Sequence, residues 1–145
     1  MNRIIKFRAW NIPNKTMYYD VQKGVLAENN KGQLVLGASL HTLCNDAGSV
    51  VTQFTGLNDI NNKEIYEGDI VKWGMLDFSK EHWHRYAKIN INPDIQFEII
   101  YYVDSQTNEK QKSDNYIFHY GKFAYKNTEK CLEIIGNIYE NPELL

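Results

Sequence analysis

The stretch FTGLNDINNKEIYEGDIVKW, residues 54–73, has turn-forming Gly, Asn and Asp residues between short apolar runs. This is the pattern of strands joined by tight turns. A strand ending at Phe54 and Thr55 meets Gly56, whose missing Cβ permits a turn or a bulge, and an Asn- and Asp-rich connection follows. Residues 63–65 then lead through a second turn into a strand at residues 70–72. This alternation is informative about the fold and gives weak evidence for chemistry. The turn motif comprises Gly56, Asn62, Gly68 and Asp69.

The clearest strand pattern is IQFEIIYYVD, residues 95–104, in which apolar side chains alternate along one face. Shorter alternating runs occur at residues 5–9, 34–36, 51–53, 70–73, 89–91 and 116–120, with turn residues between them. The sequence therefore predicts a mainly β protein (β-rich α+β). We expect antiparallel strands in a small barrel-like or sandwich domain, with one or two short helices.

Two segments have weak helical patterns. Ser39 could cap a single turn that presents Leu40, Leu43 and Cys44 on one face. Ser79 could cap a second short helix with Trp83 and Tyr86 facing inward, although an exposed insertion explains the same residues. We therefore predict one domain over residues 1–145, in which residues 75–88 and 104–115 are exposed loop or insertion segments.

The composition is typical of a soluble globular protein. Of 145 residues 43% are hydrophobic and 23% charged, the net charge is −2, and no apolar run approaches the ~18 residues that cross a bilayer. The N-terminal apolar stretch, Ile4 and Ile5, is too short for a secretory signal, so we expect the cytoplasm of a bacterial host cell. The distant Cys44 and Cys131 predict buried thiols rather than a disulfide framework.

The acidic residues of the central stretch suggest a calcium loop. An EF-hand that starts at Asp59 fails, because Lys63 and Glu64 occupy positions that require an oxygen ligand and a turn glycine. Glu64 and Glu67 also lack a context that would bury one of them and raise its pKa for acid–base catalysis. We therefore expect solvated turn carboxylates at Asp59, Glu64, Glu67 and Asp69.

The two histidines of HWH, residues 82–84, would share a face on a strand and diverge on a helix. A zinc site would still need a partner such as His41, Cys44 or His119. Surface or packing roles explain His82 and His84 more simply. Nucleotide-binding and hydrolase motifs are missing, so we predict no catalytic residue, metal ligand or cofactor and lean against an enzyme.

The first 19 residues combine a charge of +4 with interleaved aromatic residues, which is the pattern of a nucleic-acid contact. Against this, the pI is about 6.1, and the chain contains only three arginines to form bidentate phosphate contacts. Residues 54–71 and 131–145 each carry −3. Basic N-terminal and acidic later segments would attract one another within the fold or across a subunit contact.

Three motifs resemble the YopX family of phage and prophage proteins: KFRAW at 6–10, FTGLNDINNKEIYEGDIV at 54–71 and EIIGNIYENPELL at 133–145. Asn11 and Asn62 depart from the Asp and the Gly that are usual in the family, although Asn tolerates positive φ well enough to keep the turn. The resemblance implies a small, cytoplasmic, mostly β phage or prophage protein that can form oligomers, and it implies no catalytic residues.

We therefore predict a non-catalytic accessory module that binds an unidentified host or phage protein. The alternative is a metal-dependent or nucleic-acid-binding or processing factor, with nucleic acid less favoured. The sequence also allows a homo-oligomer, and no membrane partner is expected. Large aromatic side chains often dominate protein interfaces, although core packing is the more common role. The candidate interaction residues are Trp10, Tyr18, Tyr19, Trp73 and Trp83.

Overall fold

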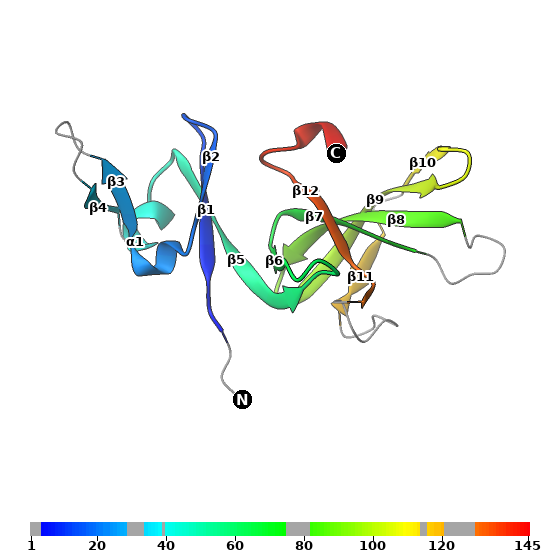
Figure 1. Cartoon of the computed structure of the whole chain (residues 1–145), viewed down its shortest axis with the longest axis horizontal. Helices are drawn as coiled ribbons and strands as arrows, with labels where there is room; N and C mark the ends of the chain where they lie inside the picture. The colour runs from blue at the N-terminus through cyan, green and yellow to red at the C-terminus, as the bar shows by residue number, and fades with distance from the viewer. Residues whose placement is uncertain (1–3, 29–33, 39, 75–81, 114–115, 121–129) are drawn as a thin grey trace. The chain divides into compact units, whose positions relative to one another are not determined.

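The computed structural model describes residues 4–28, 34–38, 40–74, 82–113, 116–120 and 130–145, without the side chains of residues 25–38. The described backbone forms two compact units, Met1–Phe54 (unit 1) and Thr55–Leu145 (unit 2), coloured blue to cyan and cyan to red in Figure 1. Mainly antiparallel β structure confirms the predicted fold class. That the units act as one domain stays a prediction.

Unit 1 is built from two small antiparallel arrangements. β1 (Phe7–Asn11) pairs with β2 (Thr16–Tyr19) in a hairpin, with Arg8 opposite Tyr19 and Trp10 opposite Met17, and β1 also pairs with β5 (Ser49–Asn58). β3 and β4 form a separate two-stranded sheet. The helix predicted after residue 39 is confirmed, although Ser39 itself lies outside the described residues. The elements are β1 (Phe7–Asn11), β2 (Thr16–Tyr19), η1 (Val21–Lys23), β3 (Val25–Glu28), β4 (Leu34–Ala38) and α1 (Leu40–Cys44).

Strand β5 (Ser49–Asn58) continues across the boundary between the units. Residues 49–53 pair with β1, and the strand also pairs with β6 (Glu64–Tyr66). The Thr55 hydroxyl donates a hydrogen bond to the Ile65 carbonyl at 2.7 Å. The boundary between the units thus falls inside a strand rather than in a linker.

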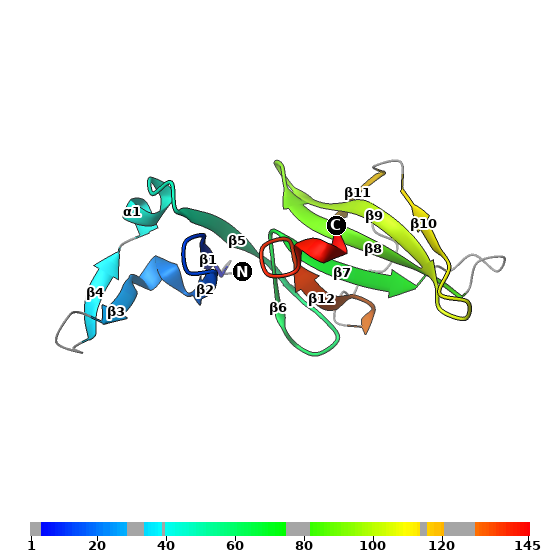
Figure 2. The ribbon, with the colours of Figure 1, turned by 90° about the horizontal axis from the view of Figure 1, so that it is seen from above.

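Unit 2 contains a curled antiparallel sheet in the order β10-β9-β8-β7-β12, with β11 also paired to β9 (Figure 2). β9 covers residues 95–104, as its alternating pattern predicts. Its neighbours supply hydrogen-bond partners along its length. The elements are β7 (Asp69–Gly74), β8 (Trp83–Ile91), β9 (Ile95–Asp104), β10 (Lys110–Lys112), β11 (Ile117–His119), β12 (Glu133–Asn137) and η5 (Pro142–Leu144).

The core of unit 2 lies on one face of this sheet. Strand pairing places Val71, Ala87 and Ile99 side by side, and side chains two residues apart extend the same face. Trp73 packs edge-on against Phe97, with ring centroids 5.5 Å apart. Burying each large apolar side chain contributes about 1.5–3 kcal/mol. The core cluster is Ile65, Val71, Trp73, Ala87, Ile89, Phe97, Ile99 and Leu132.

The segment 75–88 corrects one sequence expectation. Residues 83–88 are neither a helix nor a loop but the first part of β8, paired on both sides with β7 and β9. Pairing along two strands outweighs a weak local helical pattern. Residues 75–81, including Ser79, lie outside the described residues. In the second predicted exposed segment, residues 105–112 are exposed and contain a turn followed by β10.

Candidate functional site

Asp59 is the centre of the central motif, and it is buried rather than solvated. Its side chain is 1% exposed. Oδ1 accepts the N–H groups of Asn61 and Lys63, both at 2.9 Å, and Oδ2 accepts the N–H of Ile134 at 3.0 Å. The Ile60 N–H donates to the Leu132 carbonyl at 2.8 Å. One carboxylate therefore shapes the turn and joins it to β12, 75 residues away.

The turn residues have the backbone conformations that a tight connection needs. Gly56 has φ +86°, Asn62 φ +62° and Gly68 φ +90°, all in the region where side chains are strained and Gly or Asn is favoured. Asp69 is 2% exposed and accepts the Tyr66 N–H at 2.8 Å. Gly56, Asn62, Gly68 and Asp69 therefore fix the backbone conformation of the turns.

The C-terminal motif folds back onto this second turn. The Ile138 N–H donates to the Gly68 carbonyl at 2.9 Å, and a Cβ on Gly68 would lie 2.9 Å from the Tyr139 ring. The Asn137 side chain accepts the N–H groups of Tyr139 and Glu140 at 3.0 and 2.8 Å. The central and C-terminal motifs thus form one hydrogen-bonded structural unit.

The N-terminal motif KFRAW lies on β1 in unit 1. Arg8 is 2% exposed, and its Nε donates to the Thr52 hydroxyl at 3.2 Å. The Lys6 carbonyl accepts the Phe54 N–H at 2.9 Å, and the Lys6 ammonium lies over the Phe54 ring. This motif fixes β1 against β5.

The acidic turn is not assembled as a metal site. Asp59 and Asp69 are engaged by backbone N–H groups, which corrects the expectation that both would be solvated, whereas Glu64 and Glu67 are half-buried. Within the described ranges, no group of three or more His, Cys, Asp or Glu side chains could hold a metal ion. Asp59 and Asp69 accept backbone hydrogen bonds because the turns contain several N–H groups that need an acceptor.

The histidines and cysteines are dispersed. His84 is half-buried on β8, next to the exposed His82, and the His119 imidazole lies 3.5 Å from Asp94. Cys44 is exposed, so the prediction of two buried cysteines is wrong at this position, where the short helix α1 turns it outward. Cys131 is half-buried, and this burial raises the pKa of its thiol.

The five aromatic candidates have different environments. Trp73 is buried in the core of unit 2, and Trp10 is 9% exposed in unit 1. Tyr18 and Trp83 are half-buried. Tyr19 is 56% exposed on β2, the last strand in the order β2-β1-β5-β6. Tyr19 is thus the most exposed of the five candidates.

Sequence reasoning missed a set of side chains on the sheet face of unit 2 opposite the core. Cross-strand pairing places Lys72 beside Tyr86, and Tyr86 beside Tyr101. Recognising the set requires the strand register, although the alternation of Lys110 and Lys112 in a polar segment is a weak signal. The lysine–tyrosine face comprises Lys72, Tyr86, Lys88, Tyr101, Lys110 and Lys112.

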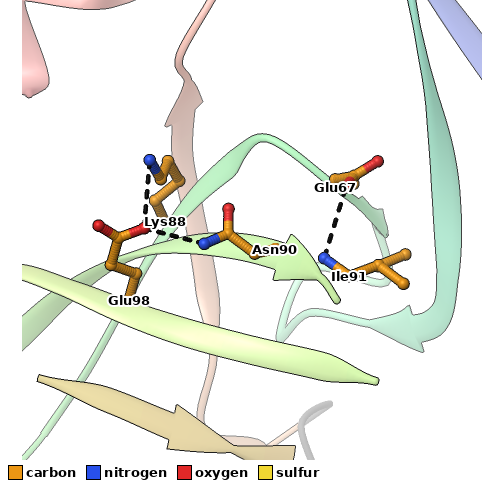
Figure 3. A network of polar contacts seen from close by, with 5 residues as sticks. All are labelled: Glu67, Lys88, Asn90, Ile91 and Glu98. Atoms are coloured by element: carbon orange, nitrogen blue, oxygen red, sulfur yellow. Dashed lines mark hydrogen bonds and ion pairs between the residues drawn. The ribbon is translucent and has the colours of Figure 1, made fainter. Parts of the chain in front are cut away.

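A polar network lies along the same face (Figure 3). The Glu98 carboxylate accepts a hydrogen bond from the Asn90 amide at 2.9 Å and forms an ion pair with Lys88 at 3.2 Å. The Asn90 hydrogen bond, together with Lys88, lowers the pKa of Glu98, against an opposing effect of burial. Glu67 accepts the Ile91 N–H at 3.4 Å, as Figure 3 also shows.

The chain is a mainly β protein of two small antiparallel units, in which buried Asp side chains accept backbone N–H groups. The chain belongs to the YopX family, whose model, described as YopX protein, matches residues 6–145. The predicted membership is thereby confirmed.

Among solved structures, the chain is similar to the crystal structure of protein EF1440 from Enterococcus faecalis. The TM-score is 0.52 at 21% identity, and the similarity covers 99% of each chain. At this identity the likeness concerns the fold alone. A search among curated proteins finds no match. No helix in the described part of the chain is long and apolar enough to span a membrane.

Proposed function

We propose that this protein is a non-catalytic accessory module of a phage or prophage that binds another protein in the bacterial cytoplasm. The observation that carries the proposal is a concentration of exposed apolar side chains in a short N-terminal segment. Large apolar residues that remain in solvent close together are typical of interaction surfaces. The N-terminal surface comprises Ile4, Ile5 and Tyr19, which are 61, 57 and 56% exposed; Ile12, 48% exposed, lies at the other end of the β1–β2 hairpin.

The strand arrangement supports a partner at this surface. β2 ends its sheet in the described structure, and the last strand of a sheet presents backbone groups to which another chain can pair. β2, with the sequence TMYY, contains neither a Pro nor a charged side chain, which are features that discourage such pairing. Tyr19 lies at its end and would provide an aromatic anchor.

The charge of unit 1 indicates the chemistry of the partner. Unit 1 contains six Lys or Arg and three Asp or Glu, for a formal charge of +3, and unit 2 contains the other ten and fifteen, for −5. Complementary charge accelerates association and selects partners. We therefore expect an acidic protein surface to bind unit 1.

The proposal that the module is non-catalytic is supported by the roles of its acids. Two of the four carboxylates in the central turn, Asp59 and Asp69, accept backbone N–H groups in buried positions. Such carboxylates fix the conformation of the turn. Protonating them during catalysis would weaken the backbone hydrogen bonds that they accept.

The experiment is a tagged pull-down from cells in which the prophage is induced, with and without nuclease, read by mass spectrometry. The variants are Tyr19→Ala and Tyr116→Ala, a matched control because Tyr116 is 57% exposed in unit 2. We expect a nuclease-resistant protein that wild type and Tyr116→Ala retain, and that purified Tyr19→Ala binds about tenfold or more weakly.

Three results would contradict the proposal. A pull-down that leaves no nuclease-resistant protein would show that no protein binds directly, and equal retention by both variants would exclude the N-terminal surface. A concentration-dependent dimer that only Tyr19→Ala dissociates, measured by sedimentation equilibrium, would assign the surface to a second copy of the chain.

A further inference from the structure

Lysines gather around two stacked tyrosines on the outer side of the sheet in unit 2. Tyr86 and Tyr101 are cross-strand partners, and their rings stack with centroids 4.8 Å apart and planes 24° apart. The Lys110 ammonium lies 3.9 Å from the Tyr101 ring centroid. Lys72 is the cross-strand neighbour of Tyr86 on the other side. Lys112 is the cross-strand neighbour of Tyr101, so a lysine lies on each side of the two stacked rings across four strands.

The lysine–tyrosine face is more positive than unit 2 as a whole. The lysine–tyrosine face has four lysines and the two carboxylates Glu98 and Glu133, a formal charge of +2, although unit 2 as a whole carries −5. Asp104, next to Val103 in sequence, alternates to the opposite face. A polyanion would therefore meet a locally positive surface on an acidic unit.

The lysines of the face differ in how they are engaged. Lys72 forms an ion pair with Glu133 at 3.5 Å, and Lys88 forms one with Glu98 at 3.2 Å. Lys110 and Lys112 are exposed on β10 and extend the face to one side of the stacked rings. Phosphate contacts would therefore concentrate on β10.

We propose that the lysine–tyrosine face binds single-stranded nucleic acid. Proteins that bind single strands combine basic side chains that follow the phosphates with aromatic rings on which bases stack. Here Lys110 and Lys112 would contact phosphates while a base stacks at the half-buried Tyr86. A duplex keeps its bases within the helix and cannot use the rings. An acidic peptide has no group that requires them.

This site is independent of the proposed protein partner. It lies wholly in unit 2, whereas the N-terminal surface lies in unit 1. It also differs from the N-terminal basic segment that the sequence suggested for nucleic acid. Failure of either proposal would therefore leave the other intact.

The test measures binding of the full chain to fluorescein-labelled oligothymidylate of about 20 nucleotides, from about 50 to 200 mM salt. The double variant Lys110→Ala, Lys112→Ala should bind about tenfold more weakly at the lower salt. Its slope of log affinity against log salt should be smaller by about 1.4, because each lost phosphate contact on a single strand removes about 0.7.

The matched control is Lys15→Ala, Lys23→Ala, which removes two exposed lysines of unit 1. Its affinity and salt slope should equal those of wild type. Tyr86→Leu should weaken binding about fivefold without changing the slope, because stacking involves no counterion release. Circular dichroism and melting temperature establish that each variant is folded. If Tyr86→Leu fails to fold, the comparison of the Lys110→Ala, Lys112→Ala variant with its control tests the proposal.

Several outcomes would overturn the proposal. If the wild-type protein does not bind the oligonucleotide at about 100 µM protein, the proposal is wrong, because even non-specific binding is normally detected at this concentration. An equal loss in both lysine pairs would show that only net charge matters. Equal binding of a duplex of the same length would remove the stacking role of Tyr86, and equal binding of polyglutamate would assign the face to acidic proteins.

Discussion

Unit 1 and unit 2 differ in how they cover their apolar side chains. All eight members of the core cluster belong to unit 2, where they share one face of the curled sheet. Among the described side chains, four large apolar ones of unit 1 are exposed within residues 4–19, whereas the four exposed ones of unit 2 are Ile60, Tyr116, Ile117 and Leu145. The difference suggests that unit 2 provides most of the stability, while unit 1 offers a contact surface.

The most severe test of the role of unit 2 is Asp59→Ala. The change removes the acceptor of three backbone N–H groups in a site that is 1% exposed. Because buried donors left without an acceptor are costly, we expect the free energy of unfolding to fall by about 4 kcal/mol. Urea denaturation followed by circular dichroism measures this loss.

Two further substitutions act as controls for Asp59→Ala. Asp59→Asn keeps an oxygen for the turn and places an amide N–H against the Ile134 N–H, so we expect about half of the loss. Asp94→Ala removes a carboxylate that is 58% exposed and should change stability by less than about 0.5 kcal/mol. Equal effects of Asp59→Ala and Asp94→Ala would show that the buried carboxylate does not stabilise unit 2.

Hydrogen exchange compares the two units directly. The slowest amides should belong to β7, β8 and β9, because each of these strands pairs with a strand on both sides and packs one face against the core. We expect their protection to exceed that of β1 and β2 by about 100-fold, equivalent to about 2.7 kcal/mol. Equal protection in the β1–β2 hairpin would contradict the division of roles between the units.

Two glycines separate backbone strain from crowding in unit 2. Gly56 and Gly68 both have φ near +90°, but a Cβ on Gly68 would lie 2.9 Å from the Tyr139 ring, and nothing lies within 4 Å of one on Gly56. Gly56→Ala should cost about 1 kcal/mol from strain alone, and Gly68→Ala about 2 kcal/mol. If thermal denaturation shows the same loss of stability for both variants, crowding by the Tyr139 ring adds nothing to the strain at Gly68.

The smallest expected effect concerns the acid sensitivity of unit 2. The pKa of Glu98 is lowered in the folded state, so its stabilising contribution is present above the unfolded pKa of about 4.3 and is lost as pH falls through the lower folded value. Glu98→Gln should therefore cost less than about 1 kcal/mol at pH 7 and nothing near pH 2. Urea denaturation at both pH values, with Glu140→Gln as an exposed control, measures this; a difference that persists at low pH would contradict it.

Local patterns predicted the elements that depend on local chemistry. The alternation in residues 95–104 predicted β9, and the helical turn after residue 39 was also found. Residues 83–88 were mispredicted because their polar side chains give a weak signal that pairing with two strands overrides. The burial of Asp59 depends on Ile134, 75 residues away, and the lysine–tyrosine face depends on register. Neither can be deduced from a short window of sequence.

The position of β5 has an evolutionary consequence. Because one continuous strand belongs to both units, a recombination event at their boundary would cut through paired residues and leave each half with an incomplete sheet. Genes exchange modules most readily where an exposed linker separates them. We therefore expect the two units to be inherited together in relatives. The family match over residues 6–145, which includes both, agrees with this expectation.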